Sequence, residues 1–222
     1  MSYTAEELDK LFSSNALERI GMGSRRACYR LPCGKLCVKC YRSDEEILEG
    51  KDPGKPNSRP LPSAAVNEIK CFRFDERHNT CCQEYRYWQR LPEDARQYFP
   101  SLMQMQYTFS RGWCVVEELI TNNDGSPIVK LLPAWKTTDG NGRQQLASEL
   151  NALEELFAIH SIRFFDPQTI MVQQTREGLR LRIPDFEPAI RTLIPIETMF
   201  PALVRTKMRR RFARYRKTLG IE

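Results

Sequence analysis

The chain has 222 residues, of which 41% are hydrophobic and 28% are charged, a composition typical of folded globular proteins that argues against a largely disordered chain. No apolar run approaches the roughly 18 residues that a membrane-spanning helix needs, so we expect no transmembrane segment. The N-terminal sequence MSYTAEELDKLF lacks the basic and then apolar layout of a secretory signal. These features predict a cytoplasmic protein.

Eight cysteines and two histidines raise the question of a metal site. No C-x2-C pair is followed by a matching histidine pair, so a structural zinc site is disfavoured, and we predict that most of the cysteines are small buried hydrophobes. The segment CGKLCVKC, residues 33–40, has a spacing that can hold an iron–sulfur cluster. The same segment has a strand pattern that would place Cys37 and Cys40 on opposite faces. The pattern therefore favours a strand that carries Lys39.

The first half of the chain predicts mostly strands, with helices at its start and end. A short helix is expected near residues 4–12, followed by an antiparallel three-stranded meander within residues 16–42. Residues 43–62 are rich in proline and glycine, so an insertion at 43–66 is expected to be a loop that contributes little to the core. Residues 63–91 have a helical pattern with a possible break near 77–79, and Pro92 marks its end.

The second half begins with strands and ends with helices. A hairpin that turns at Arg111-Gly112 is expected within residues 101–120, and residues 122–127 break the pattern. A helix is predicted for 143–160, a strand for 179–184, and a basic helix at the end of the chain. This order of elements predicts an α+β fold in two lobes.

In this order, several segments resemble the motifs of protein kinases. The sequence GMGSRRACY resembles the glycine-rich phosphate loop, with Gly21 and Gly23 kept, and CVK resembles the strand whose lysine, here Lys39, contacts the α- and β-phosphates. Glu84 in QEYRYWQRL matches the helix glutamate that pairs with that lysine. The segment CVVEELI resembles the last strand and the hinge, where backbone groups from Glu118 to Ile120 would contact adenine.

More specifically, the chain resembles the YrbL family of PhoP regulatory network proteins, a divergent group of the protein-kinase-like superfamily. The segments that carry this resemblance are GMGSRRACY, EYRYWQRL, VEELITNNDGSPI, DPQTIMV and TLIPIETMF…MRRRFARYRK. The resemblance implies a bilobal fold with an antiparallel-sheet N-lobe at 1–118 and a mostly helical C-lobe at 119–222. It also implies a link to a bacterial, magnesium-responsive regulatory network.

The catalytic motifs depart from the kinase pattern. When the proline of the kinase catalytic loop is aligned with Pro167, Phe164 takes the place of the catalytic base and Thr169 that of the metal-binding asparagine. Asp166 lies two residues after the base position and could act only if the loop shifts. Asp185 keeps the Mg²⁺-binding position of the D-F-G motif, although Glu187 replaces the glycine.

These motifs predict a divergent kinase-like protein that binds ATP and Mg²⁺ in a cleft between lobes and is regulatory, with weak or no phosphotransfer. An active atypical kinase that uses Asp166 is the alternative. Structural interpretations also remain open: Glu84 could be a solvated helix charge, Asp166 part of a turn, and Asp185 a strand-end cap.

The positive charge of the chain is concentrated at its C-terminal end. Residues 201–222 hold eight Lys or Arg and one acid, and the net charge of the whole chain is +6, so the rest is close to neutral. Apolar residues recur there at helical spacing, namely Val204, Met208, Phe212, Tyr215 and Leu219. This stripe predicts a helix packed on the larger lobe. The cations could bind an acidic protein, an anionic membrane surface or, less favoured, nucleic acid as a non-catalytic module.

Overall fold

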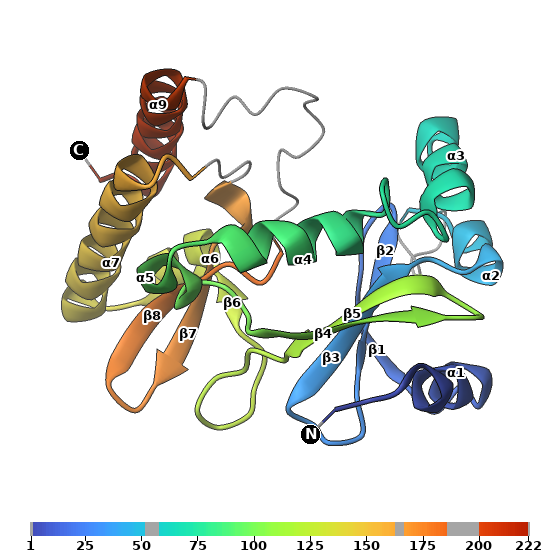
Figure 1. Cartoon of the computed structure of the whole chain (residues 1–222). Helices are drawn as coiled ribbons and strands as arrows, with labels where there is room; N and C mark the ends of the chain where they lie inside the picture. Colours follow the sequence, from blue (N-terminus) through green and yellow to red (C-terminus); the bar gives the residue numbers. More distant parts are fainter. Residues whose placement is uncertain (1, 52–57, 163–166, 186–199, 222) are drawn as a thin grey trace. The chain divides into compact units, whose positions relative to one another are not determined.

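The computed structural model describes residues 2–51, 58–162, 167–185 and 200–221 (Figure 1). The chain forms two compact units: one combines residues up to Gln89 with Ser101–Leu119, and the other combines Arg90–Pro100 with residues from Ile120 onwards. The predicted α+β class is confirmed. The predicted N-lobe, 1–118, includes residues 90–100, which the structure groups with the second unit.

A five-stranded antiparallel sheet forms the first unit, in the order β1-β2-β3-β5-β4. Its strands are β1 (Glu18–Met22), β2 (Arg26–Arg30), β3 (Leu36–Tyr41), β4 (Leu102–Thr108) and β5 (Gly112–Glu118). The predicted meander is confirmed, and so is the hairpin, although its turn spans residues 109–111 and Gly112 is the first residue of β5. Because side chains alternate along a strand, Val38 and Cys40 of β3 enter one hydrophobic core, whereas Cys37 and Lys39 belong to the opposite face.

Helix α1 (Ala5–Ser13) covers the face that carries Val38. Thr4 and Glu7 form a capping box at its start, and the buried Leu8 and Phe12 join the core under the sheet. Asp9 fastens the helix to the β4–β5 turn by accepting hydrogen bonds from the amides of Phe109 (2.7 Å) and Ser110 (2.9 Å). The predicted helix at 4–12 is therefore confirmed.

The insertion begins as a helix, so the prediction of a loop that contributes little to the core is wrong for its described part. Ser43 caps α2 (Asp44–Leu48), and its partner Glu46 is only 5% exposed. Glu46 accepts hydrogen bonds from the Tyr29 hydroxyl and from the Arg111 guanidinium (2.5 Å). Burial alone would raise the pKa of Glu46, but these hydrogen bonds and the Arg111 charge hold it below its usual value. Composition could not reveal this long-range pairing.

Two longer helices follow α2 and are separated by the predicted break. They are α3 (Ser63–Phe72) and α4 (Thr80–Arg90), and Pro92 ends this pattern before the short α5 (Glu93–Arg96). Asn79 starts α4 because its side-chain oxygen accepts the amides of Cys81 (2.8 Å) and Cys82 (3.4 Å).

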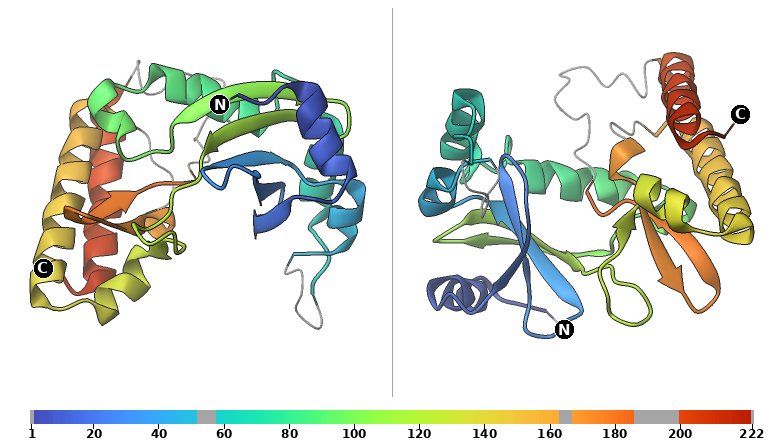
Figure 2. Two further views of the ribbon diagram at one scale, coloured as in Figure 1. Left: turned by 90° about the horizontal axis from the view of Figure 1, so that it is seen from below. Right: turned by 180° about the vertical axis from the view of Figure 1, so that it is seen from behind.

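The second unit combines a three-stranded antiparallel sheet with helices. Its strands are β6 (Val129–Lys130), β7 (Met171–Thr175) and β8 (Gly178–Arg182). Its described helical elements are α5, α6 (Leu131–Thr137), α7 (Gly140–Ile159), the 3-10 turn η1 (Pro167–Thr169) and α9 (Pro201–Leu219). The sequence patterns did not predict α6 or β6. Helices α7 and α9 lie side by side in both views of Figure 2.

The apolar stripe of the basic helix is buried, as predicted. Val204, Met208, Phe212, Tyr215 and Leu219 are each at most 7% exposed. Phe212 packs edge-on against Phe157 of α7, and Phe157 also stacks on Phe99. Among the described residues, no helix is both long and apolar enough to cross a bilayer.

Candidate functional site: a buried cluster of four charges

Lys39 lies near the middle of β3, on the sheet face opposite α1. Its side chain is 10% exposed, and its ammonium lies 2.7 Å from Glu117 Oε1 and 3.7 Å from Glu84 Oε1. A lysine is rarely buried to this extent unless it is paired. The local fold therefore holds a cation away from bulk water between two carboxylates.

Helix α4 supplies Glu84, which is fully buried. Cys81 lies one helical turn earlier, and its thiol donates to the backbone oxygen of Lys39 at 3.6 Å. This contact seats the first turns of α4 on β3 and brings the Glu84 carboxylate to the lysine. Glu84 is therefore a paired charge, and the alternative of a solvated helix residue is wrong.

Glu117 was not predicted as a site residue, yet it is the nearer partner of Lys39. It lies on β5 opposite Cys37 and is 1% exposed. Burial raises the pKa of Glu117 to about 7, an effect that the Glu84 carboxylate increases and the Lys39 ammonium opposes. The strand pattern of the run VVEE was the sequence feature that could have pointed to Glu117, because alternation along the strand places it on the same sheet face as Lys39.

Arg26 completes the cluster from β2. Its guanidinium forms an ion pair and a hydrogen bond with Glu84 Oε2. Arg26 therefore adds a second cation beside Lys39. When Glu117 is ionised, the two cations and two carboxylates balance in charge, which is the arrangement that makes buried charges tolerable.

The cluster is balanced in charge but is not fully hydrogen-bonded. Glu117 Oε2 and Glu84 Oε1 are both buried and have no hydrogen-bond partner among the described residues, although Glu84 Oε1 keeps its ion pair with Lys39. Buried polar atoms usually have such partners. The cluster therefore retains acceptor capacity.

The two loop glycines lie beside this cluster. Gly21 pairs with Cys28, and Cys28 pairs with Lys39, so Gly21 is two strands, or roughly 10 Å, from the lysine. Gly23 closes the turn by donating its amide to the Arg26 oxygen at 2.8 Å. A Cβ at either glycine would meet its nearest neighbour at 3.8 Å, an ordinary contact, so the turn itself does not require glycine.

The predicted hinge follows β5. The Glu118 amide donates to Ser101 O and the Leu119 amide donates to Lys35 O, both at 2.9 Å. These two donors are therefore already used within the first unit. Ile120 is 6% exposed and belongs to the second unit.

The predicted metal ligands belong to the second unit as well. Asp185 is exposed and follows Ile183, whose amide donates to Tyr98 O at 2.7 Å, and Thr169 ends the turn η1. Asp166 and Phe164 lie outside the described residues. Carboxylate and hydroxyl oxygens suit a hard cation, so the residue types fit Mg²⁺.

The cysteines of the first unit fit the strand interpretation better than a cluster-binding loop. Five of the eight cysteines are buried, and all eight are free thiols. Cys40 is packed in the core with Val38, whereas the Cys37 thiol contacts Glu117 on the other face at 3.9 Å. The predicted placement of Cys37 and Cys40 on opposite faces is confirmed.

No protein-family model and no curated protein sequence matches this chain.

Proposed function

We propose that the chain is a kinase-like protein that binds ATP, with Lys39 as the main contact to the phosphates. The observation that carries this proposal is the nearly buried ammonium of Lys39, held by a carboxylate from α4 and another from β5. Protein kinases place their phosphate-binding lysine on the third strand and pair it with a helix glutamate. Lys39 and Glu84 meet both conditions.

The glycines of the β1–β2 turn support the same proposal. Neither Gly21 nor Gly23 has a positive φ, and added side chains would make only ordinary contacts. A ligand that approaches the backbone closely is one reason for glycine at such positions. Because the Gly23 amide is bonded to Arg26 O, the turn must open before that amide can contact a phosphate.

Phosphate binding at Lys39 would change the charge balance around the buried Glu117. A phosphate that binds Lys39 competes with Glu117, which lies 2.7 Å from the ammonium. Without that partner, the buried Glu117 carboxylate would be costly, and its pKa of about 7 allows it to take up a proton instead. We therefore propose that ATP binding at neutral pH is coupled to proton uptake.

The metal and the transfer step remain part of the proposal. Mg²⁺ would be held by Asp185 and Thr169 together with phosphate oxygens, and it would neutralise charge on the phosphates. Phe164 at the base position cannot orient or deprotonate a hydroxyl, so we propose a regulatory protein with weak or no phosphotransfer. Measurable transfer that is lost in Asp166→Asn would instead favour the active atypical kinase.

Isothermal titration calorimetry with ATP and Mg²⁺ tests this proposal. We expect wild-type protein to bind, and we expect Lys39→Met to weaken binding by at least tenfold because the phosphate loses its cation. Lys35→Met is the matched control, since Lys35 is exposed in the turn before β3 and should bind as wild type. Absent binding to wild type, or equal binding to all three proteins, would refute the proposed role of Lys39.

A further inference from the structure

Two consecutive arginines at the end of the glycine turn are paired with two different helices. Arg25, the last residue of the turn, donates a hydrogen bond from its Nε to Glu68 Oε2 of α3 at 2.7 Å. Arg26, the first residue of β2, forms the ion pair with Glu84 of α4 described above. Neighbouring side chains therefore attach the turn to both helices, and all four residues belong to the first unit.

The backbone of the turn is held as well. The Gly23 amide donates to Arg26 O at 2.8 Å, and the amide of Arg42, directly after β3, donates to Arg25 O at 3.0 Å. The fully buried Arg42 guanidinium donates to Gly23 O at 3.4 Å. The turn is therefore closed, and its Gly23 amide is already used within the protein.

The two arginine pairs differ in their burial. The side chains of Arg25 and Glu68 are 25% and 13% exposed, whereas those of Arg26 and Glu84 are 12% and 0% exposed. Breaking an ion pair costs more when its charges are buried. We therefore expect the turn to open at Arg25 while Arg26 stays anchored to α4.

We propose that the Arg25–Glu68 ion pair is an autoinhibitory latch that holds the glycine turn closed against α3. Its release frees the Gly23 amide for a phosphate oxygen, because successive backbone N–H groups in such turns bind anions. The apparent affinity for a nucleotide is reduced in proportion to the fraction of molecules in the open state. The inference rests on the ATP binding proposed above, but closure of the turn is measurable without nucleotide.

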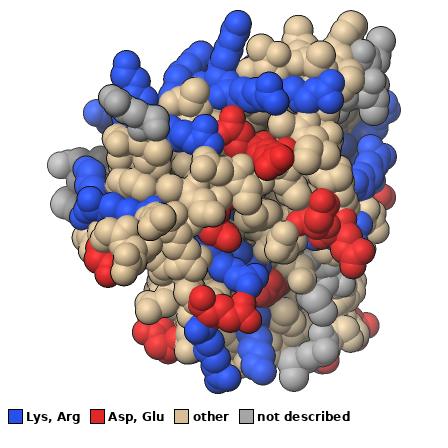
Figure 3. Space-filling model, turned by 90° about the vertical axis from the view of Figure 1, so that its left-hand side faces the viewer, with Lys and Arg blue, Asp and Glu red and all other residues tan. Residues whose placement is uncertain are grey.

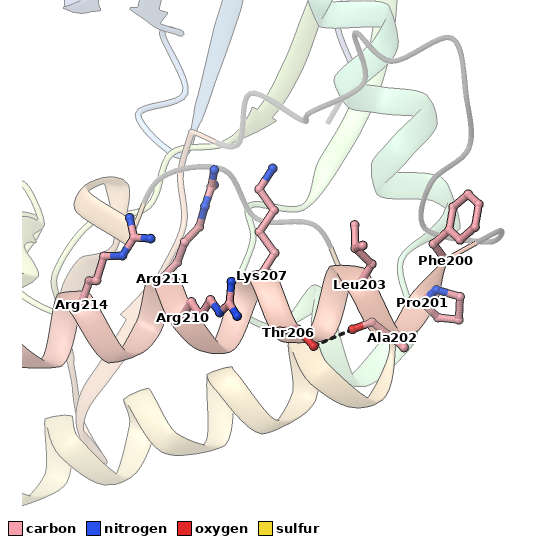
Figure 4. Close-up of a pocket in the computed structure, with 9 residues that line it drawn as sticks. All are labelled: Phe200, Pro201, Ala202, Leu203, Thr206, Lys207, Arg210, Arg211 and Arg214. Carbon is pink, nitrogen blue, oxygen red and sulfur yellow. Dashed lines mark hydrogen bonds between the residues drawn. The ribbon is translucent and has the colours of Figure 1, made fainter.

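Helix α9 presents a second group of cations to the phosphates of a nucleotide. A cavity of about 930 Å³ is lined by Lys207, Arg210, Arg211 and Arg214. Figure 4 shows Lys207, Arg211 and Arg214 extending from the same side of the helix, and Lys and Arg side chains gather over α9 in the upper part of the face in Figure 3. A test of the latch must therefore separate ATP binding at the turn from ATP binding at α9.

Two measurements on Glu68→Gln test the latch. Amide hydrogen exchange followed by NMR reports the opening of the Gly23 hydrogen bond, and isothermal titration calorimetry reports the Kd for ATP with Mg²⁺. Because Glu68→Gln removes a partly buried charged hydrogen bond, we expect exchange at Gly23 to be about fivefold faster. The Kd for ATP should fall by the same factor, since both values follow the open fraction. Lys39→Met should change ATP binding in the opposite direction.

Two further variants control for charge. Glu18→Gln removes the same charge from the other end of the β1–β2 hairpin, where Glu18 pairs with Arg30 at 3.2 Å, and should leave both values unchanged. Arg25→Glu combined with Glu68→Arg restores an ion pair with exchanged charges and should return the exchange rate towards that of wild type.

A third control removes cations from α9. In a background of Lys207→Gln, Arg210→Gln and Arg214→Gln, the Glu68→Gln substitution should still lower the Kd for ATP by the same factor. Circular dichroism shows whether each variant is folded. A gain in affinity that disappears in this background would arise at α9 and would refute the latch.

The remaining outcomes distinguish the latch from the ATP site. Unchanged exchange at Gly23 in Glu68→Gln, or an equal effect of Glu18→Gln, would refute the latch even if ATP binds at Lys39. Faster exchange with unchanged or weaker ATP binding would refute its autoinhibitory role. Faster exchange in a protein that binds no ATP, as wild type or variant, would refute the proposed function and phosphate as the ligand of the open turn, while the ion pair would still be what closes the turn.

Discussion

Removing the charge of Lys39 should destabilise the first unit strongly. Lys39→Met keeps an unbranched side chain of similar length but leaves the buried carboxylates of Glu84 and Glu117 with Arg26 as the remaining cation of the described cluster. Removing one partner of a buried ion pair typically costs about 3–5 kcal/mol. We expect a loss of this size in the free energy of unfolding at pH 8, where Glu117 is ionised.

A second substitution should restore much of this loss. Glu117→Gln removes the nearer carboxylate charge, so Lys39→Met combined with Glu117→Gln should be more stable than Lys39→Met alone. Residues in contact show coupling energies of about 0.5–3 kcal/mol, and we expect a value of about 2 kcal/mol here. The coupling should be favourable because the two charges are opposite, and its size depends on their separation of 2.7 Å.

Urea unfolding followed by tryptophan fluorescence measures these values. Trp88 and Trp113 belong to the first unit, so a Trp135→Phe background confines the signal to that unit. A cost below about 1 kcal/mol for Lys39→Met, or a coupling energy near zero, would show that the ammonium does not compensate the buried acids. The account of the cluster would then be wrong.

Three further outcomes follow from the structure. Because the pKa of Glu117 is raised to about 7 from an ordinary value near 4.5, its ionisation costs the native state stability. This destabilisation is absent below about pH 4.5 and grows to roughly 3 kcal/mol above pH 7. The free energy of unfolding of Glu117→Gln should therefore fall less over that pH range than that of wild type, as urea titrations at several pH values would show. Arg111→Ala removes the charge beside buried Glu46 and should cost about 3 kcal/mol in chemical unfolding, with Arg111→Lys retaining part of it; equal stability of both variants and wild type would contradict the pairing. Phe212→Ala removes a fully buried ring that contacts Phe157 and should cost about 3–5 kcal/mol by thermal denaturation, whereas an unchanged melting temperature would mean that α9 is not docked as described.

Elements with a strong local pattern could be predicted from the sequence. The alternation around Val38 and Lys39 determined the strand and its faces, and the repeat of Val204, Met208 and Phe212 determined the buried side of α9. Each pattern involves residues that are close together in the sequence, within a few helical turns or one strand, so it can be recognised from the sequence alone.

The charged interior could not be predicted in the same way. Glu117 and Lys39 are 78 positions apart in the sequence (117 − 39). No local pattern shows that their two strands lie side by side. Glu46 and Arg111 pair across a similar separation, and hydropathy alone would place both on the surface. Such pairs depend on strand order and register, which follow from the whole fold.

Covalent labelling of the phosphate-binding lysine tests the central claim most directly. An acyl phosphate derivative of ATP transfers its acyl group to a lysine amine that lies beside the bound phosphates, and mass spectrometry identifies the modified residue. We expect modification of Lys39 that excess ATP with Mg²⁺ suppresses, and much weaker labelling of exposed Lys35. Labelling that ignores ATP and follows the exposure of each lysine would contradict phosphate binding at Lys39.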